Sequence, residues 1–251
     1  VVSNKFVYFG EYWYDNGGLP SILVNYLKTH ELNIFEYLDK DKFLKVSSDD
    51  FKNPTALTTI NQNVLMCQTG YLTLRSDLNK TSTVALGIPN GEIYKALNRL
   101  LANNIFKGNT DITDDYGRSL LEVGTVDDII NLFNCALNSV SYDNYPIVSE
   151  SSVQNMLKLY LLGAHQEVLS EVHEAKGRAD LIVNTDNRRI VFEFKYAKNE
   201  TEAKSKLLDA VEQIKTRDYG NIVPKKTELL RIATVFNADP KVRAFTEYQS
   251  V

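Results

Sequence analysis

The sequence predicts an α/β domain with a mixed sheet in its C-terminal part, preceded by a mostly α-helical module that contains a small β-hairpin. From residue 150 onward, helical and strand patterns follow one another in the order α-β-β-β-α-β. A helix that joins the third strand to the fourth crosses over the sheet, so helices must pack on that sheet. Before residue 148, apolar residues recur mainly at spacings of three and four, which is typical of helices.

The composition is that of an ordinary globular protein. The chain has 251 residues, of which 43% are hydrophobic and 24% charged. No run of about 18 apolar residues occurs, so a transmembrane helix is excluded and no membrane partner is expected. Cys67 and Cys135 lie far apart and have no second Cys or His at ligand spacing. Neither a zinc site nor a disulfide framework is expected, and a cytoplasmic location fits.

The charge of the chain is unevenly distributed. The formal net charge of −4 argues against a protein that coats nucleic acid without specificity. From Glu150 onward, however, the chain contains 16 Lys and Arg residues and 15 Asp and Glu residues. The acidic excess therefore lies before Glu150. The C-terminal part is therefore where we expect a phosphate-bearing partner to bind.

The chain begins at Val1 without an initiating Met or a signal-peptide pattern, so we expect it to be part of a longer protein. Its first 147 residues predict helices around one small hairpin. Helices are expected at residues 19–27, 35–43, 93–101 and 126–137, and β-prone segments at 64–74 and 82–86. This order is winged-helix-like, but the candidate recognition helix offers only Lys95 and Arg99 as basic groups. A packing module is therefore favoured over a DNA reader.

The polar, turn-rich stretch from Val140 to Ser149 is the predicted domain boundary. It divides the chain into a helical region at residues 1–147 and an α/β domain at residues 148–251. In the second part, helices are expected at residues 151–162 and 201–217, and strands at 168–172, 179–183, 190–196 and 229–236. Thr185 to Arg189 is predicted to be the turn of a hairpin between the second and third strands.

Three charged residues of this hairpin are predicted to converge. Side chains alternate along a strand, so Glu193 and Lys195 share one face, and Asp180 stands on the neighbouring strand. We expect the carboxylates of Asp180 and Glu193 to lie roughly 3 to 6 Å apart. Such a carboxylate pair with a lysine suits metal-assisted phosphodiester hydrolysis, because hard oxygen ligands bind Mg²⁺ and the amine positions the attacking water.

A structural alternative exists for this trio. Glu-x-Lys on a strand is common as a solvent-exposed pair. Here, however, the strand from Ile190 to Tyr196 otherwise has the composition of a buried strand, and charged groups in such a place need a partner or an ion. The functional interpretation is therefore favoured.

The same residues resemble the PD-(D/E)XK nuclease superfamily. The resemblance lies in Gly177 to Leu181, in Val191 to Lys195, and in Gln213 with Tyr219. More narrowly, the chain looks like the nuclease-like region that follows an AAA-ATPase-like domain in many bacterial and archaeal proteins. Upstream segments that add to this likeness are Tyr12 to Tyr14, Gly17 to Pro20, Gln68 to Leu72 and Ile88 to Glu92.

The resemblance implies a restriction-endonuclease-like fold, a Mg²⁺ or Mn²⁺ cofactor and a set of site residues. Asp180 and Glu193 would be metal ligands, Lys195 the catalytic lysine, and Gln213 would point from its helix into the same pocket. Glu150, at the start of the first core helix, is a candidate third ligand, although a helix-N-terminal acid favoured by the dipole explains it equally well. Ala179 stands where the motif has proline, and this departure leaves the ligand that follows it intact.

The sequence is compatible with two functions. The first is a metal-dependent nuclease acting on DNA, with RNA the less favoured substrate. The second is a catalytically silent docking or nucleic-acid-binding module that regulates an N-terminal ATPase domain outside this sequence. No Gly-rich loop ending in Lys-Ser or Lys-Thr occurs here, so ATP binding is not expected. The sequence leaves the oligomeric state open.

Overall fold

The computed structural model describes residues 21–27, 30, 32–53, 56, 58–76, 82–106, 115–164, 166–174, 177–219 and 227–251, without the side chains of 115, 116 and 171–174. The chain divides into two compact units, Val1–Leu100 and Leu101–Val251. The segments Tyr12 to Tyr14 and Gly17 to Pro20 lie outside the described residues. The boundary expected between residues 147 and 148 stays a prediction.

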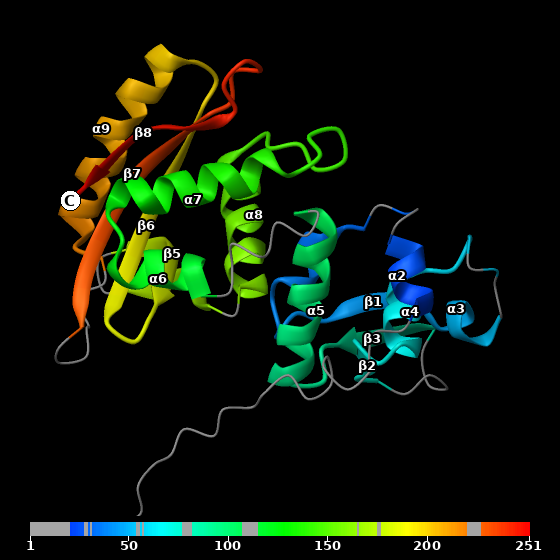
Figure 1. The fold of residues 1–251 in the computed structure, drawn as a ribbon. Coiled ribbons are helices and arrows are strands. Elements are labelled where there is room, and N and C mark those ends of the chain that lie inside the picture. Colours follow the sequence, from blue (N-terminus) through cyan, green and yellow to red (C-terminus); the bar gives the residue numbers. More distant parts are fainter. Residues whose placement is uncertain are drawn as a thin grey trace, which may run out of the picture. The chain divides into compact units, whose positions relative to one another are not determined.

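The smaller unit is built on a three-stranded antiparallel sheet with the strand order β1-β3-β2 (Figure 1). Its elements are α2 (Ser21–Leu27), the 3-10 helix η1 (Ile34–Tyr37), β1 (Leu44–Ser47), α3 (Ser48–Lys52), α4 (Gln62–Gln68), β2 (Thr73–Leu74), β3 (Thr83–Gly87) and the first part of α5 (Gly91–Ile105). β2 and β3 pair antiparallel, which confirms the predicted small hairpin. The helix expected at residues 93–101 forms as part of α5, and its apolar residues Ile93, Leu97, Leu100 and Leu101 are buried.

One β-prone segment was predicted wrongly. Residues 64–68 form the end of α4, and only Thr73 and Leu74 of the expected strand are extended. The Asn61 side chain caps this helix by accepting the N–H of Asn63 at 2.9 Å. Val64 and Met66 are fully buried. A cap and burial on one helical face therefore override the weak strand propensity of this segment.

The prediction of a helix at residues 35–43 was also wrong. Only η1 forms there, and β1 begins at Leu44. The Asp39 carboxylate accepts the N–H of Asp41 at 3.0 Å, which is the side-chain-to-backbone bond of a turn. Such bonds compete with the backbone bonds that a continuing helix requires, so the apolar spacing was misleading.

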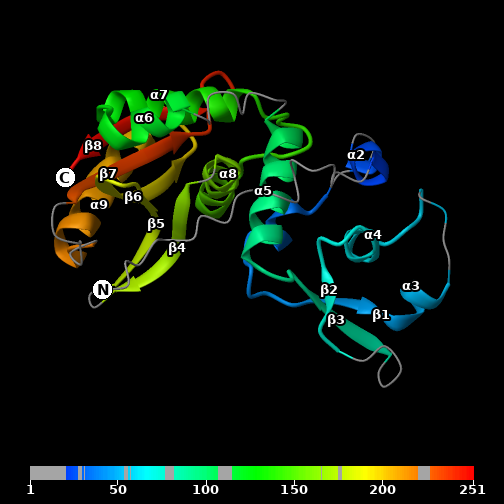
Figure 2. The same cartoon turned by 60° about the horizontal axis from the view of Figure 1, so that its bottom comes forward.

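The larger unit is a five-stranded mixed sheet with helices on both faces (Figures 1 and 2). Its elements are the end of α5, α6 (Asp115–Val123), α7 (Val126–Asn138), α8 (Glu150–Gly163), β4 (Glu167–Glu174), β5 (Gly177–Asn184), β6 (Arg188–Ala197), α9 (Glu200–Arg217), β7 (Glu228–Asn237) and β8 (Ala244–Ser250). The strand order is β4-β5-β6-β7-β8, and only β6 and β7 are parallel. The predicted order from the first core helix to the fourth strand is confirmed.

The fifth strand, β8, was missed. It follows β7 in an antiparallel pairing at the edge of the sheet. Phe245 is its one fully buried residue, while Thr246, Gln249 and Ser250 are exposed. An edge strand with a single anchor gives no hydrophobic alternation for a sequence pattern to detect.

The core lies on both faces of this sheet, and β6 contributes to each. Phe192 and Phe194 face α7, where the ring of Phe192 lies 5.3 Å from that of Phe133. Val191 and Ala197 lie in apolar clusters with residues of α9. The predicted alternation along β6 is therefore confirmed, and it directs Glu193 and Lys195 toward the α9 face.

Truncation of this aromatic layer has a predictable effect. Phe192 is fully buried, so we expect Phe192→Ala to lower the free energy of unfolding by about 3–5 kcal/mol. Leu208 on α9 is 70% exposed, and Leu208→Ala is the control, with an expected change within about 0.5 kcal/mol. Urea unfolding followed by circular dichroism measures both. Equal effects of the two substitutions would contradict the described core.

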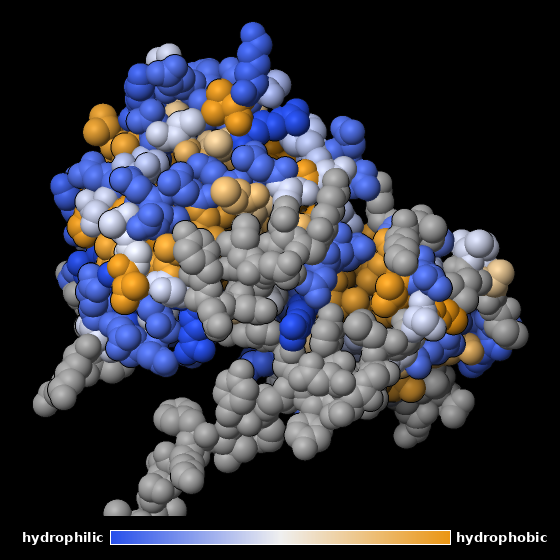
Figure 3. All heavy atoms as spheres, viewed as in Figure 1, coloured by the Kyte–Doolittle hydropathy of each residue, from blue (hydrophilic) through white to orange (hydrophobic). Residues whose placement is uncertain are grey.

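One face of the larger unit shows no concentrated hydrophobic patch among its described residues (Figure 3). On the face drawn in Figure 3, its described residues are mainly hydrophilic, with hydrophobic side chains scattered among them. Scattered apolar residues are normal on a protein surface. Among the described residues, no helix is long and apolar enough to cross a membrane.

Candidate active site

The site forms where β5 stops pairing with β6. The last pair of this ladder on the side of the site joins Leu181 to Phe192. One residue beyond it, Oδ2 of Asp180 accepts the backbone N–H of Phe194 at 2.9 Å. A side chain thus replaces the strand partner at this point. This bond holds the Asp180 carboxylate beside the part of β6 that carries Glu193 and Lys195.

Glu193 and Lys195 form a buried ion pair. Nζ of Lys195 lies 2.6 Å from Oε1 of Glu193. The Glu193 side chain is 0% exposed and that of Lys195 is 17% exposed. Oε2 of Glu193 is buried and has no hydrogen-bond partner among the described residues. A buried carboxylate oxygen without a partner is costly, and this one lies within a charged cluster.

Glu150 also reaches this cluster. It is the first residue of α8, whose start is fixed by a capping box between Ser149 and Ser152. Oε1 of Glu150 lies 3.7 Å from Nζ of Lys195, and the Glu150 side chain is 42% exposed. Lys195 therefore stands between a buried carboxylate and a partly exposed one.

Burial and mutual repulsion shape the charges of the two central carboxyl groups. The pKa of Glu193 is raised to about 7, first by burial and then by the charge of Asp180, against the opposing effect of Lys195. The pKa of Asp180 is also raised, mainly by burial, although its bond from Phe194 acts the other way. The site therefore holds more negative charge than one ammonium group neutralises, and a further cation would be stabilised there.

The charge of Lys195 is secured by its acidic neighbours. Burial disfavours its ammonium form, but the hydrogen bond and charge of Glu193, together with the charges of Glu150 and Asp180, keep the pKa of Lys195 above its ordinary value. Lys195 is therefore a cation at neutral pH. It can orient a water or stabilise a developing negative charge, but it does not act as a base in this state.

Sequence reasoning missed Gln154, which supports the site from α8. Its Nε2 donates to the carbonyl oxygen of Asp180 at 2.5 Å, and its side chain is buried. This bond fixes the β5 backbone at the residue that carries the carboxylate. A signal was available, since Gln154 follows Glu150 by four residues and so lies on the same helix face.

Arg217, the last residue of α9, is a further basic residue near the two carboxylates. Its Nη1 donates to the hydroxyl oxygen of the buried Tyr219 at 2.8 Å. This bond raises the pKa of Arg217, and the charges of Glu193 and Asp180 add to the effect. A Cβ at Gly177 would lie 2.6 Å from Cδ of Arg217 and 3.2 Å from the Tyr219 ring. Arg217 and Tyr219 thus pack over the start of β5, within the electric field of the two carboxylates.

Two further expectations concern the direction of the Gln213 side chain and the distance between the carboxylates of Asp180 and Glu193. Gln213 is half-buried on α9, and its backbone carbonyl accepts the hydroxyl of Thr216 at 3.2 Å. That its amide faces the site stays a prediction, as does the 3 to 6 Å separation of the Asp180 and Glu193 carboxylates. Within the described part of the chain, no group of three or more His, Cys, Asp or Glu side chains is arranged to hold a metal by itself.

Comparison with known proteins supports the nuclease-type fold. Residues 148–246 match the family model described as the PD-(D/E)XK nuclease superfamily. This range runs from the residues before α8 into β8 and includes Glu150, Asp180, Glu193 and Lys195. None of the curated proteins or solved structures in the comparison matches the chain. The family match and the mixed α/β topology together give residues 148–246 a fold of the PD-(D/E)XK nuclease type.

Proposed function

We propose that this chain is a divalent-metal-dependent nuclease that hydrolyses phosphodiester bonds of DNA, with RNA the less favoured substrate. The observation that carries the proposal is the buried Glu193, whose Oε2 has no hydrogen-bond partner among the described residues while Asp180 and Lys195 lie beside it. An ion pair with a purely structural role does not need a second buried carboxylate beside it. A site that binds a divalent cation does need such an excess of negative charge.

The residues present fit Mg²⁺ or Mn²⁺. Asp180 and Glu193 would hold the ion, and Glu150 is the candidate third ligand. Mg²⁺ characteristically keeps several waters and takes only one or two protein carboxylates, so a site with few protein ligands suits it. When bound, the ion would supply an activated water and polarise a phosphoryl oxygen.

The chain's own residues would prepare the reaction. Lys195, kept charged by Glu193 and Glu150, would orient the attacking water and stabilise charge on the phosphate. Gln154 would keep the Asp180 backbone in place through its hydrogen bond to the carbonyl oxygen. Arg217, fixed by Tyr219, would contact a phosphate of the bound strand, because a guanidinium group suits bidentate contacts with phosphate oxygens.

The alternative is a catalytically silent module that docks nucleic acid or a partner. The direct contact between Lys195 and Glu193 favours this alternative. In a protein that never binds a metal, the lysine alone would neutralise part of the charge of the Glu193 carboxylate. In this alternative the module regulates an ATPase domain of a longer protein. That ATPase partner stays a proposal.

Asp180→Asn separates the two functions. Asparagine keeps an oxygen that can accept the N–H of Phe194 but loses the charge that would bind metal. For the nuclease we expect cleavage in Mg²⁺ to fall at least about a hundredfold, while DNA affinity in Ca²⁺ changes less than about threefold. Asp186→Asn on the exposed β5–β6 turn is the control and should leave both unchanged. A parent and Asp180→Asn variant with the same cleavage rate would rule out this site.

A further inference from the structure

The three-stranded sheet of the smaller unit has two different sides. One side is apolar and buried, and it consists of Leu44, Val46, Val84 and Leu86. Figure 2 draws the sheet with α4 on one side of it. Side chains alternate along a strand, so the residues between these four belong to the other side. This other side, the open face of the small sheet, consists of Phe43, Lys45, Ser47, Thr73, Arg75, Thr83, Ala85 and Gly87.

Phe43 is a large aromatic residue on the open face, and it is 60% exposed. It comes directly before β1 and packs on Gly87 of β3. A Cβ at Gly87 would lie 3.1 Å from Cδ1 of Phe43 and 3.0 Å from Nε of Arg75. Glycine therefore allows the ring and the guanidinium group to pack closely on the same strand. The ring is held by the sheet and is still accessible to a ligand.

Two cations accompany the ring on the open face. Lys45 is exposed and pairs with Ala85 from one side. The N–H of Arg75 donates to the carbonyl oxygen of Ala85 at 2.8 Å from the other side. Nη2 of Arg75 donates to the carbonyl oxygen of Ile88 at 2.6 Å, which fixes its guanidinium group. No residue of the open face is acidic, so the face carries positive charge beside an exposed ring.

This combination fits single-stranded nucleic acid. Unpaired bases stack on aromatic side chains, while lysine and arginine contact the phosphates. A β-sheet that presents aromatic residues is an established surface for unpaired bases. An apolar protein surface is a poorer fit, because it would bury the charges of Lys45 and Arg75 without a partner.

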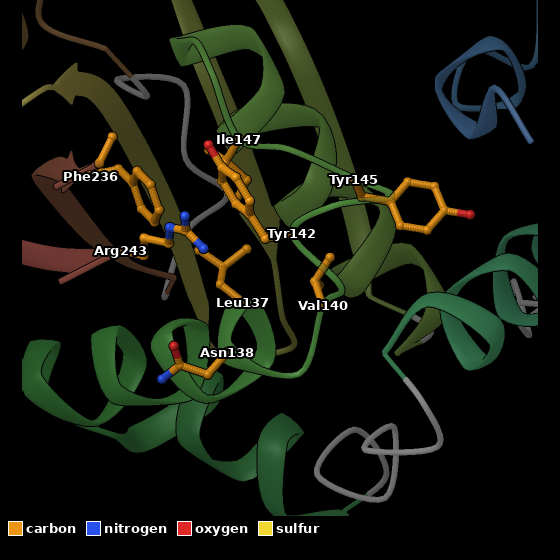
Figure 4. Close-up of a pocket in the computed structure, with 9 residues that line it drawn as sticks. Leu137, Asn138, Val140, Tyr142, Tyr145, Ile147, Phe236 and Arg243 are labelled. Carbon is orange, nitrogen blue, oxygen red and sulfur yellow. The ribbon is translucent and has the colours of Figure 1, made fainter. Parts of the chain in front are cut away.

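An aromatic ring in a cavity of the larger unit is a weaker candidate for such stacking. This cavity has a volume of about 160 Å³ and lies between Tyr142, Phe236 and Arg243 (Figure 4). The guanidinium carbon of Arg243 lies 3.4 Å from the centre of the Tyr142 ring. That face of the ring is therefore already occupied by a side chain of the protein.

We propose that the open face of the small sheet binds a single-stranded segment of DNA. One base would stack on Phe43, and phosphates would contact Lys45 and Arg75. The choice of DNA rests on the nuclease function proposed above, but this binding needs neither the metal nor the carboxylates of the active site. The proposal narrows the substrate to DNA that contains an unpaired segment.

Fluorescence anisotropy with labelled oligo(dT) in EDTA measures this binding without cleavage. We expect Phe43→Ala to weaken the binding of oligo(dT) about tenfold, on the scale of one base stacked on an aromatic side chain. The affinity for the duplex of oligo(dT) with oligo(dA) should stay unchanged, because its bases are already paired. Phe43→Trp keeps a ring and should keep the affinity. Phe43→Leu keeps an apolar side chain without a ring and should weaken binding as alanine does.

The salt dependence of binding tests the cations. Lys45→Ala should lower the slope of log affinity against log salt concentration by about 0.7, which corresponds to one phosphate contact with a single strand. Lys52→Ala is the control in the same unit. The Lys52 side chain is 55% exposed, and its Nζ lies 3.9 Å from the Asp49 carboxylate. Equal changes of slope in the two variants, with the fold intact by circular dichroism, would remove Lys45 from the site and overturn the proposal.

The binding surface and the nuclease can fail separately. No binding of oligo(dT) by the parent, or unchanged affinity in a folded Phe43→Ala variant, would overturn the proposal. Full affinity in Phe43→Leu would also overturn it and would indicate an apolar partner such as a protein. Cleavage in Mg²⁺ together with binding that does not depend on Phe43 would reject the open face and leave the nuclease. Binding that depends on Phe43 without cleavage under any metal would reject the nuclease and leave the single-strand-binding surface.

Discussion

Lys195→Ala is expected to lower the rate of DNA cleavage in Mg²⁺ by about a hundredfold or more, the scale for losing one preorganised group that stabilises the transition state. Nζ of Lys195 is the cation that contacts Glu193 at 2.6 Å and Glu150 at 3.7 Å. Alanine removes this cation without adding bulk. Single-turnover cleavage and DNA affinity in Ca²⁺ would be measured side by side, and affinity should change far less than the rate.

Lys204→Ala is the matched control. Lys204 is 62% exposed on α9, and its Nζ lies 2.6 Å from the Glu200 carboxylate. Lys204→Ala also replaces a paired lysine by alanine, but in a solvent-exposed ion pair that contributes little to stability. Both variants should keep the helix and strand content of the parent. If the two substitutions lowered cleavage equally, Lys195 would be a general contributor of positive charge and not a catalytic residue.

Glu193→Gln is expected to remove a pH dependence of the free energy of unfolding, and this is the second large effect. The folded-state pKa of Glu193 is about 7, above the ordinary value of 4.5. The folded protein therefore holds the proton more tightly than the unfolded chain does. Between pH 4.5 and 7 the folded state loses stability as pH rises, by on the order of 2–3 kcal/mol for a shift of this size.

Glutamine mimics the protonated acid at every pH. We therefore expect the free energies of unfolding of the parent and of Glu193→Gln to differ increasingly in favour of the variant from pH 5 to pH 8. Urea titrations at four pH values in EDTA would measure this difference. At pH 8, Mg²⁺ should raise the melting temperature of the parent more than that of the variant, and the variant should not cleave. Parallel pH profiles would contradict a raised pKa at Glu193.

The α/β part of the chain could be predicted because its signals are local. The strand at residues 188–197 is rich in aromatic and β-branched residues, and the helix at 200–217 has apolar residues at helical spacing, so the sequence indicated both. The predicted convergence of the charged residues on one hairpin followed from the alternation of side chains along this strand and from Asp180 on the strand before it. That these residues form a functional site was predicted from their charge, because charged groups in a buried strand need a partner or an ion.

The remaining features depend mainly on contacts between elements that are distant in the sequence. Gln154 supports Asp180 through a bond between residues 26 positions apart, and Arg217 is positioned by Tyr219 at the end of α9. Phe245 anchors β8 in an aromatic layer with Phe133 and Phe194, although the strand itself reads as polar. Gln154 and the strand around Phe245 were missed because their roles exist only after α8 and β8 have packed on the sheet.

The most direct test of the central claim is cleavage of linear duplex, circular duplex and single-stranded DNA by the purified chain in Mg²⁺, Mn²⁺ or EDTA. We expect cleavage of at least one substrate with Mg²⁺ or Mn²⁺. EDTA should abolish it, and renewed metal should restore it. Asp180→Asn, prepared in parallel, excludes a contaminating nuclease when it is inactive. Absence of cleavage by the folded parent on every substrate with either metal would contradict the nuclease and leave the docking module.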